Sequence, residues 1–120
     1  MGYLALSLLA VSDLEDIERY SMERWGEPVA ARYMGAIETA LRRLKAHPEL
    51  LRDSPEIFRN LKFYRVEKHY LVCAVVMDNI YVLTVKHGAM NLPERLAELE
   101  PLLEREAEIL HRAFLESLKD

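Results

Sequence analysis

The 120-residue chain has few of the residues that cross-link or interrupt a fold: one cysteine, four glycines, five prolines and one tryptophan. Cys73 has no second cysteine to pair with, and it lies in the apolar run YLVCAVVM. We therefore expect a reduced, cytoplasmic protein in which Cys73 is a small buried hydrophobic residue. One cysteine gives no metal cluster, and no histidine pair has ligand spacing with a third ligand, so neither a metal nor another cofactor is expected.

Long apolar runs are also missing. No run approaches the length that spans a membrane. The apolar start MGYLALSLLAVSDLEDI has no basic residue before it and acids directly after it, so a signal peptide is not expected. Gly-rich phosphate loops and nucleophile motifs are absent, which excludes the enzyme classes defined by them. The length suits one domain with a core of its own.

Charge is unevenly distributed along the chain, which has a net charge of −4. Residues 1–41 hold seven acids and three bases, and residues 93–120 hold eight acids and four bases. Residues 42–68 hold eight bases and four acids. An acidic chain binds nucleic acid poorly in general, so direct DNA binding is not expected. The basic segment either is neutralised by the acidic parts of the same fold or meets an anionic partner.

The first half of the chain predicts a strand followed by two helices. Residues 3–9 are apolar enough for a strand, and Ser12 with Glu15 forms a capping box for a helix that ends at Gly26. A second helix opens with Pro28 and ends before Pro48. The two helices form an antiparallel hairpin, in which Tyr20 and Trp25 are expected to be packing residues.

The middle of the chain changes to the composition of strands. Three strands are predicted at about residues 61–67, 69–77 and 80–86, with Asp78-Asn79 as the tight turn between the last two. Both alternating sets of the middle strand are apolar. Because a half-solvated strand would alternate with polar residues, both faces of the sheet are expected to be covered.

Residues 93–120 predict an amphipathic helical extension with an apolar stripe on a charged background. Proline in a helix interior costs roughly 3 kcal/mol, so we expect a short helix to about Glu98 and a second helix from Pro101. The extension either covers the sheet, forms a homodimer with a second copy, or orders only with a partner. The stripe consists of Leu96, Leu99, Leu103, Ile109, Leu110, Phe114 and Leu118.

Three stretches in this order resemble the ParE/RelE superfamily of bacterial toxins, and the ParE branch most closely: SDLEDIERYSMERWG, AARYMGAIETALRRLKAHPEL and LKFYRVEKHYLVCAVVMDNIYVLTVKHGAMN. The resemblance covers roughly residues 3–92. It implies an α+β fold of order β-α-α-β-β-β, with the helical hairpin on a small antiparallel sheet. The toxin domain would then be residues 1–92, and residues 93–120 would be an extension of the same domain or a dimerisation element.

The resemblance implies the toxin of a type II toxin–antitoxin (plasmid-stabilisation) module, neutralised by a cognate antitoxin. ParE-like members poison DNA gyrase, whereas RelE-like members cut mRNA on the ribosome. RelE-like catalysis uses arginines, and Thr84 and Ala89 stand in arginine-prone places, so we favour a protein-binding toxin without catalytic residues. The alternatives are an mRNA endonuclease that uses Lys86, His87 and Arg65, and a degenerate member that only binds and regulates. The candidates for contact with the target or antitoxin are Arg59, Lys62, Arg65, Lys68 and Lys86.

Overall fold

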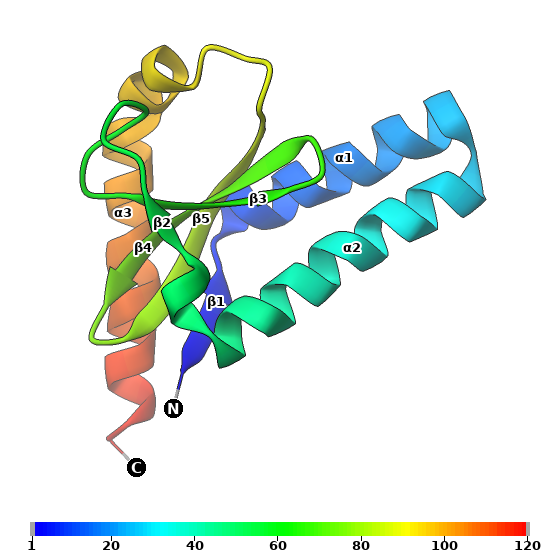
Figure 1. Cartoon of the computed structure of the whole chain (residues 1–120). Helices are drawn as coiled ribbons and strands as arrows, with labels where there is room; N and C mark the ends of the chain where they lie inside the picture. Colours follow the sequence, from blue (N-terminus) through cyan, green and yellow to red (C-terminus); the bar gives the residue numbers. More distant parts are fainter. Residues whose placement is uncertain (1, 120) are drawn as a thin grey trace.

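A mixed five-stranded sheet lies between a helical hairpin on one face and a C-terminal helix on the other (Figure 1). The computed structural model describes residues 2–119. No helix within that range is long and apolar enough to cross a membrane. The elements in chain order are β1 (Tyr3–Leu6), α1 (Leu8–Trp25), α2 (Glu27–Ala46), the 3₁₀ turn η1 (Pro48–Leu50), β2 (Arg52–Asp53), β3 (Lys62–Val66), β4 (His69–Val76), β5 (Asn79–His87) and α3 (Leu92–Ser117).

The strand order across the sheet is β1-β5-β4-β3-β2. The predicted three-stranded meander is confirmed, because β3, β4 and β5 pair antiparallel in succession. The first strand, however, pairs parallel with β5, with Leu4 beside Ile80, so the sheet is mixed rather than wholly antiparallel. The short strand β2 was not predicted, and it pairs with β3 through only two residues.

The β4–β5 turn is one residue earlier than the sequence suggested. Val76 pairs with Asn79, so the two turn residues are Met77 and Asp78, with φ of 52° and 66°. Two positive φ values match the right-handed twist of a two-residue hairpin. Asn79 instead begins β5, where its buried side-chain amide donates to the Tyr81 hydroxyl at 3.2 Å.

Helix α1 begins before the predicted capping box. Its N-cap is Ser7, whose hydroxyl oxygen accepts from the backbone N–H of Ala10 at 3.0 Å. The same hydroxyl donates to the carbonyl of Leu83 in β5 at 2.7 Å. The prediction of Ser12 and Glu15 was therefore wrong, because Ser7 both caps the helix and continues the pairing along β5.

The helical hairpin is confirmed, and its tip extends beyond the sheet (Figure 1). Gly26 ends α1 with φ of 92°, a backbone conformation that favours glycine, and its N–H donates to the carbonyl of Met22. Tyr20 and Trp25 are 59% and 58% exposed, so their expected packing role was wrong. Their helical spacing is regular, but no strand or helix lies over the tip to cover them.

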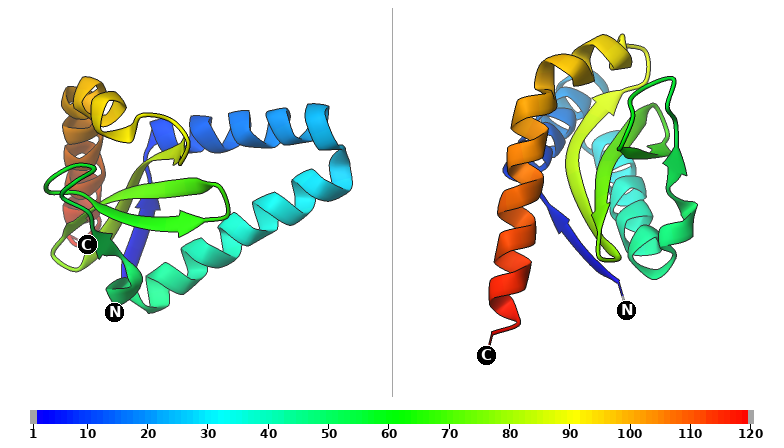
Figure 2. Two further views of the ribbon diagram at one scale, coloured as in Figure 1. Left: turned by 45° about the horizontal axis from the view of Figure 1, so that its top comes forward. Right: turned by 90° about the vertical axis from the view of Figure 1, so that its left-hand side faces the viewer.

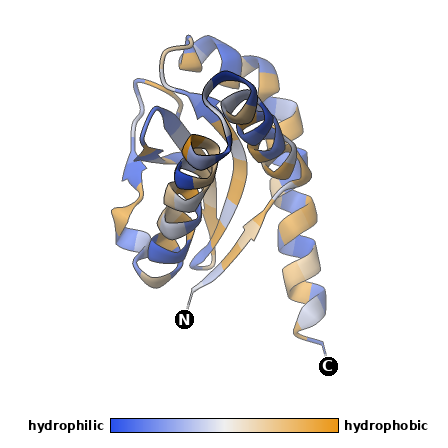
Figure 3. Cartoon of the chain, turned by 90° about the vertical axis from the view of Figure 1, so that its right-hand side faces the viewer, coloured by the Kyte–Doolittle hydropathy of each residue, from blue (hydrophilic) through white to orange (hydrophobic). Residues whose placement is uncertain are grey.

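Both faces of the sheet are covered, as the apolar middle strand predicted. Toward the hairpin, Leu71, Cys73 and Val82 belong to one buried cluster with Ile37 and Leu44 of α2. Cys73 is fully buried, as expected, and burial raises the pKa of its thiol to about 12. Figure 3 shows apolar residues in the strands between the helices and alternating polar and apolar turns on α3.

Helix α3 covers the other face and is continuous through Pro101, so the predicted break before this proline was wrong. Its ribbon bends in its first third, where the colour changes from yellow to orange (Figure 2). Proline cannot donate a hydrogen bond to the carbonyl four residues earlier, which accounts for a bend. Leu96 and Leu103, on either side of Pro101, are buried against the sheet and keep both parts in place.

Two polar contacts also attach α3 to the rest of the fold. The Glu106 carboxylate is buried and accepts from the backbone N–H groups of Leu8 and Leu9, at 3.0 and 3.4 Å, in the first turn of α1. His111 Nδ1 lies 2.8 Å from the Tyr81 hydroxyl, which is otherwise enclosed in the sheet. These contacts give α3 a defined position in addition to its apolar packing.

Candidate functional site

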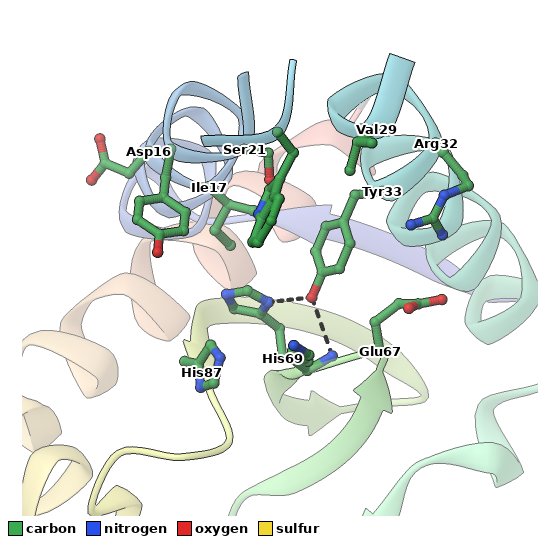
Figure 4. A pocket seen from close by; sticks show the side chains of 12 residues that line it. Asp16, Ile17, Ser21, Val29, Arg32, Tyr33, Glu67, His69 and His87 are labelled. Carbon is green, nitrogen blue, oxygen red and sulfur yellow. Dashed lines mark hydrogen bonds between the residues drawn. The ribbon is translucent and has the colours of Figure 1, made fainter. Parts of the chain in front are cut away.

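A cleft of about 530 Å³ lies between the outer half of the hairpin and the ends of β4 and β5 (Figure 4). The helices contribute aromatic and aliphatic residues together with three polar ones: Asp16, Ile17, Tyr20, Ser21 and Trp25 of α1, and Val29, Arg32 and Tyr33 of α2. The strand side consists of the β3–β4 turn and the ends of two strands. The cleft is therefore apolar mainly on its helical side, whereas every residue of its strand side is polar. The strand-side residues are Glu67, Lys68, His69 and His87.

Tyr33 joins the two sides of the cleft. Its hydroxyl lies 2.5 Å from Nδ1 of His69 and accepts from the backbone N–H of Lys68 at 3.1 Å (Figure 4). Burial raises the pKa of Tyr33, so the phenol remains protonated. Since the hydroxyl accepts one hydrogen bond and has one proton to donate, it donates to a neutral His69 ring. The β3–β4 turn is thereby held against α2.

His69 and His87 are direct partners in the β4–β5 pairing, and their ring centroids are 5.1 Å apart. Burial of the ring, followed by repulsion from a protonated His87, lowers the pKa of His69 to about 4, against a smaller opposing effect of Asp13. His69 is therefore neutral at pH 7. His87 lies at the exposed end of β5, and its Nδ1 accepts a hydrogen bond from the backbone N–H of Ala89 at 3.0 Å.

The lowered pKa of His69 predicts a loss of stability in mild acid. Its folded pKa of about 4 lies below the ordinary 6.5, so the unfolded chain binds more protons between these values. The contribution of neutral His69 to the free energy of unfolding is complete above about pH 6.5 and is lost as the pH falls toward 4. We expect urea unfolding to give a free energy on the order of 1–2 kcal/mol smaller at pH 5 than at pH 7. The His69→Gln variant should show a smaller difference between the two pH values. Equal differences in the variant and the unmodified protein would mean that His69 does not cause the pH dependence.

Asp13 of α1 closes the edge of β5 beyond the end of β1. Its Oδ2 accepts from the Thr84 hydroxyl at 2.5 Å and from the backbone N–H of Val85 at 3.0 Å. Its Oδ1 lies 3.4 Å from Nζ of Lys86, and the Lys86 and Asp13 side chains are only 13% and 12% exposed. Lys86 is therefore the partner of a buried carboxylate rather than a solvated cation.

The five predicted contact residues do not form one surface. Lys68 lies in the cleft, and Arg65 lies beside it with Nε donating to the carbonyl of Glu67 at 3.0 Å. Lys62 forms an ion pair with Asp53 at 2.9 Å. Arg59 is in the loop before β3, where it lines a separate hollow of about 160 Å³ beside α3.

Arg65, Lys86 and His87, the three residues of the nuclease alternative, are close in register but differ in their surroundings. Arg65 faces Tyr70 across β3 and β4, and Tyr70 faces Lys86 across β4 and β5. The Arg65 guanidinium lies over the Tyr70 ring at 5.3 Å from its centroid. Because the Lys86 ammonium is paired with Asp13, the exposed members of the three are Arg65, which is held by neutral groups, and His87.

Sequence reasoning missed the cleft and its central residues, Tyr33 and His69. A two-residue turn at Met77-Asp78 would by itself place His69 opposite Lys86, and only the register shift between Val72 and Cys73 brings His69 opposite His87. No signal in the sequence marks the approach of Tyr33, because that contact depends on the angle between α2 and the sheet.

A helical hairpin on a mixed sheet, with a partly apolar cleft where the hairpin meets the strand ends, defines an α+β fold. The chain matches the fold of a solved structure described as the chromosomal ParDE toxin–antitoxin system from P. aeruginosa, with a TM-score of 0.64, 17% identity, and coverage of 72% of this chain and 96% of that chain.

Sequence comparisons identify the family. Residues 4–92 match the model described as ParE toxin of type II toxin–antitoxin system, parDE. The chain is 33% identical to Toxin ParE of Escherichia coli over 94 residues, covering 78% of this chain and 91% of the relative. It is 26% identical to Toxin ParE3 of Caulobacter vibrioides over 98 residues, covering 82% and 98%. The chain belongs to the ParE toxin family, which confirms the resemblance and the predicted fold class. Most of α3 lies beyond the matched residues.

Proposed function

We propose that this ParE-family toxin acts in the cytoplasm by binding a protein, for which DNA gyrase is the favoured target, and that a cognate antitoxin neutralises it. The observation that carries the proposal is the cleft, whose rim exposes Tyr20 and Trp25 to solvent. Exposed aromatic residues beside a concave, partly apolar surface are typical of protein-binding sites. A partner segment that buries these two side chains would gain most of its affinity there.

The surroundings of the basic residues support binding over RNA cleavage. Metal-free cleavage needs a base, an acid and cations that stabilise the developing phosphorane charge. Lys86 is paired with Asp13, and the Arg65 guanidinium lies over a tyrosine ring. Thr84 is buried and bonded to Asp13 where an arginine would be needed. Lys86 and Arg65, two of the three residues of the nuclease alternative, are therefore held by other side chains of the fold, although Lys68 and Arg32 also line the cleft beside His87.

The second candidate is an mRNA endonuclease that uses Lys86, His87 and Arg65. The observation in its favour is the exposed His87 ring at the end of β5, close to the neutral His69. A neutral and an exposed histidine at 5.1 Å could exchange roles as base and acid. The third candidate, a degenerate member that only binds and regulates, would have the same cleft without a toxic effect.

Induction of the chain in bacteria separates the three candidates. Gyrase inhibition should trigger the DNA-damage response, and the purified chain should then inhibit supercoiling by gyrase in vitro. An endonuclease should instead arrest translation and leave cleaved mRNA, and the double substitution Lys86→Ala with His87→Ala should abolish the cleavage. Cleaved mRNA that depends on these residues would overturn the proposal, and normal growth would indicate a degenerate member.

The cleft itself is tested by paired substitutions on α1. We expect Trp25→Ala combined with Tyr20→Ala to weaken binding of the cognate antitoxin or gyrase by at least roughly tenfold, because large aromatic residues dominate interface energies. Met22→Ala is the matched control, since Met22 is 45% exposed on the same helix but does not line the cleft. Isothermal titration calorimetry measures both, and equal effects of the two changes would place the interface elsewhere.

We also infer that residues 93–120 complete the core of the domain formed by residues 1–92, rather than forming a homodimer. The support is the burial of Leu96, Leu103 and Glu106 against the sheet and the start of α1. These contacts account for the inner face of α3 within a single copy.

A further inference from the structure

A second hollow, of about 500 Å³, lies on the other side of Tyr33, between α2 and the end of β3. Arg32 and Arg43 of α2 and Arg65 of β3 line it, with Glu67 as the acidic residue among its lining. We refer to this hollow as the arginine groove. Small residues of α2 form its floor, and a side chain added at Gly35 would meet no atom within 4 Å, so the groove is open at its centre.

Within the described residues, the three arginines of the groove form no ion pair. Within residues 2–119, none of them lies within 4.0 Å of a carboxylate oxygen. Arg65 is nevertheless held in place by the carbonyl of Glu67 and the ring of Tyr70. Arg42, the neighbour of Arg43 in the chain, is instead paired with Glu38 at 3.0 Å and does not line the groove.

The acidic helix α3 does not neutralise the groove. Residues 42–68 contain eight bases and four acids, and the acidic α3 lies on the opposite face of the sheet from α2. The ion pair found within α3 joins its own Arg95 and Glu98 at 3.2 Å. Within the basic segment, Arg42 and Lys62 are paired with Glu38 and Asp53, whereas Arg43 and Arg65 of the groove are left for an anionic partner.

We propose that the arginine groove binds an acidic polypeptide segment of a partner protein, at a surface next to the aromatic cleft, with which the groove shares Arg32 and Glu67. Complementary charge at such a surface speeds association and selects the partner. The net charge of −4 repels any polyanion at long range, so the attraction must come from the local cluster of three arginines. Glycine and alanine on the floor let the partner's main chain lie close to α2 while its carboxylates reach the arginines.

The test measures binding of a short, labelled oligoglutamate peptide to the full-length chain by fluorescence anisotropy at low ionic strength. Arg32→Gln combined with Arg43→Gln should weaken binding about fivefold, because each exposed charge pair contributes modestly. Gly35→Leu should weaken it as well by filling the groove while keeping every charge. Arg42→Gln is the matched control and should change the affinity less than about twofold, and circular dichroism verifies that α2 remains helical in each variant.

Three outcomes would overturn the proposal. The peptide fails to bind the unmodified chain, Arg42→Gln weakens binding as much as the groove variant does, or a single-stranded RNA of equal length binds more tightly than the peptide. An oligoglutamine peptide should bind the unmodified chain at least roughly fivefold more weakly than oligoglutamate. Equal binding of the two peptides would show that the arginines are not the determinants.

Discussion

A chain that stops after Leu92 is expected to aggregate on purification, because it exposes the sheet face that α3 covers. Phe63, Val72, Tyr81 and Leu83 on that face are each no more than 2% exposed in the intact fold. Truncation of a single buried leucine to alanine costs about 2–5 kcal/mol, and loss of the whole helix removes several such residues. The total approaches the full stability of a small domain, about 5–15 kcal/mol. Light scattering and dye binding measure the result.

A shorter truncation, after Leu115, is the control, because it retains Leu96, Leu103, Glu106 and His111 and should leave a soluble protein. Leu103→Ala in the full chain should lower the free energy of unfolding by about 2–5 kcal/mol without precipitation. If the chain ending at Leu92 were instead soluble and monomeric, residues 93–120 would not be a cover, and the dimerisation interpretation would gain support.

Replacement of Asp13 by alanine is also expected to have a large effect, lowering the free energy of unfolding by about 3 kcal/mol. The change leaves the Lys86 ammonium, 13% exposed, without a counter-charge and removes the acceptor for the Thr84 hydroxyl and the Val85 N–H. Removal of one partner from a buried ion pair typically costs about 3–5 kcal/mol. Urea unfolding monitored by circular dichroism gives the value.

Asp16→Ala provides the comparison on the same helix. Asp16 pairs with Arg19 at 2.9 Å, but both side chains are more than 60% exposed, so the cost should stay below about 1 kcal/mol. Asp13→Asn should fall between the two, because an amide oxygen still accepts the Val85 N–H but carries no charge. If the Asp13 and Asp16 variants lost similar amounts of unfolding free energy, the hydrogen bonds of Asp13 to β5 would contribute little to stability.

The meander was predictable because its signals are local. The apolar runs of β4 and β5 have no helical period, and the positions between them can adopt a tight turn. Gly26 likewise ends α1 through its own backbone freedom. The covered state of both sheet faces followed from the composition of β4 alone, since each alternating set of its residues is apolar.

The errors arose where distant parts of the chain decide the outcome. Ser7 caps α1 because its hydroxyl also reaches Leu83, 76 residues away. Tyr20 and Trp25 lie in the apolar pattern of α1, but this pattern does not show where the hairpin extends beyond the edge of the sheet. Pro101 stays inside α3 because apolar packing on both sides offsets the lost hydrogen bond. Among the predicted site residues, the pairing of Lys86 with Asp13 could not be predicted, because the two residues are 73 positions apart.

The contact between Glu106 and the first turn of α1 also determines when the fold is complete during synthesis. Leu8 leaves the ribosome early, yet the carboxylate that accepts its N–H is encoded 98 residues later. Pairing of β1 with β5 is similarly long in sequence, and such contacts form late and slowly. The finished sheet, with α3 in place, therefore forms only after Glu106 has been synthesised. Until then the apolar sheet face that includes Phe63 and Tyr81 remains uncovered.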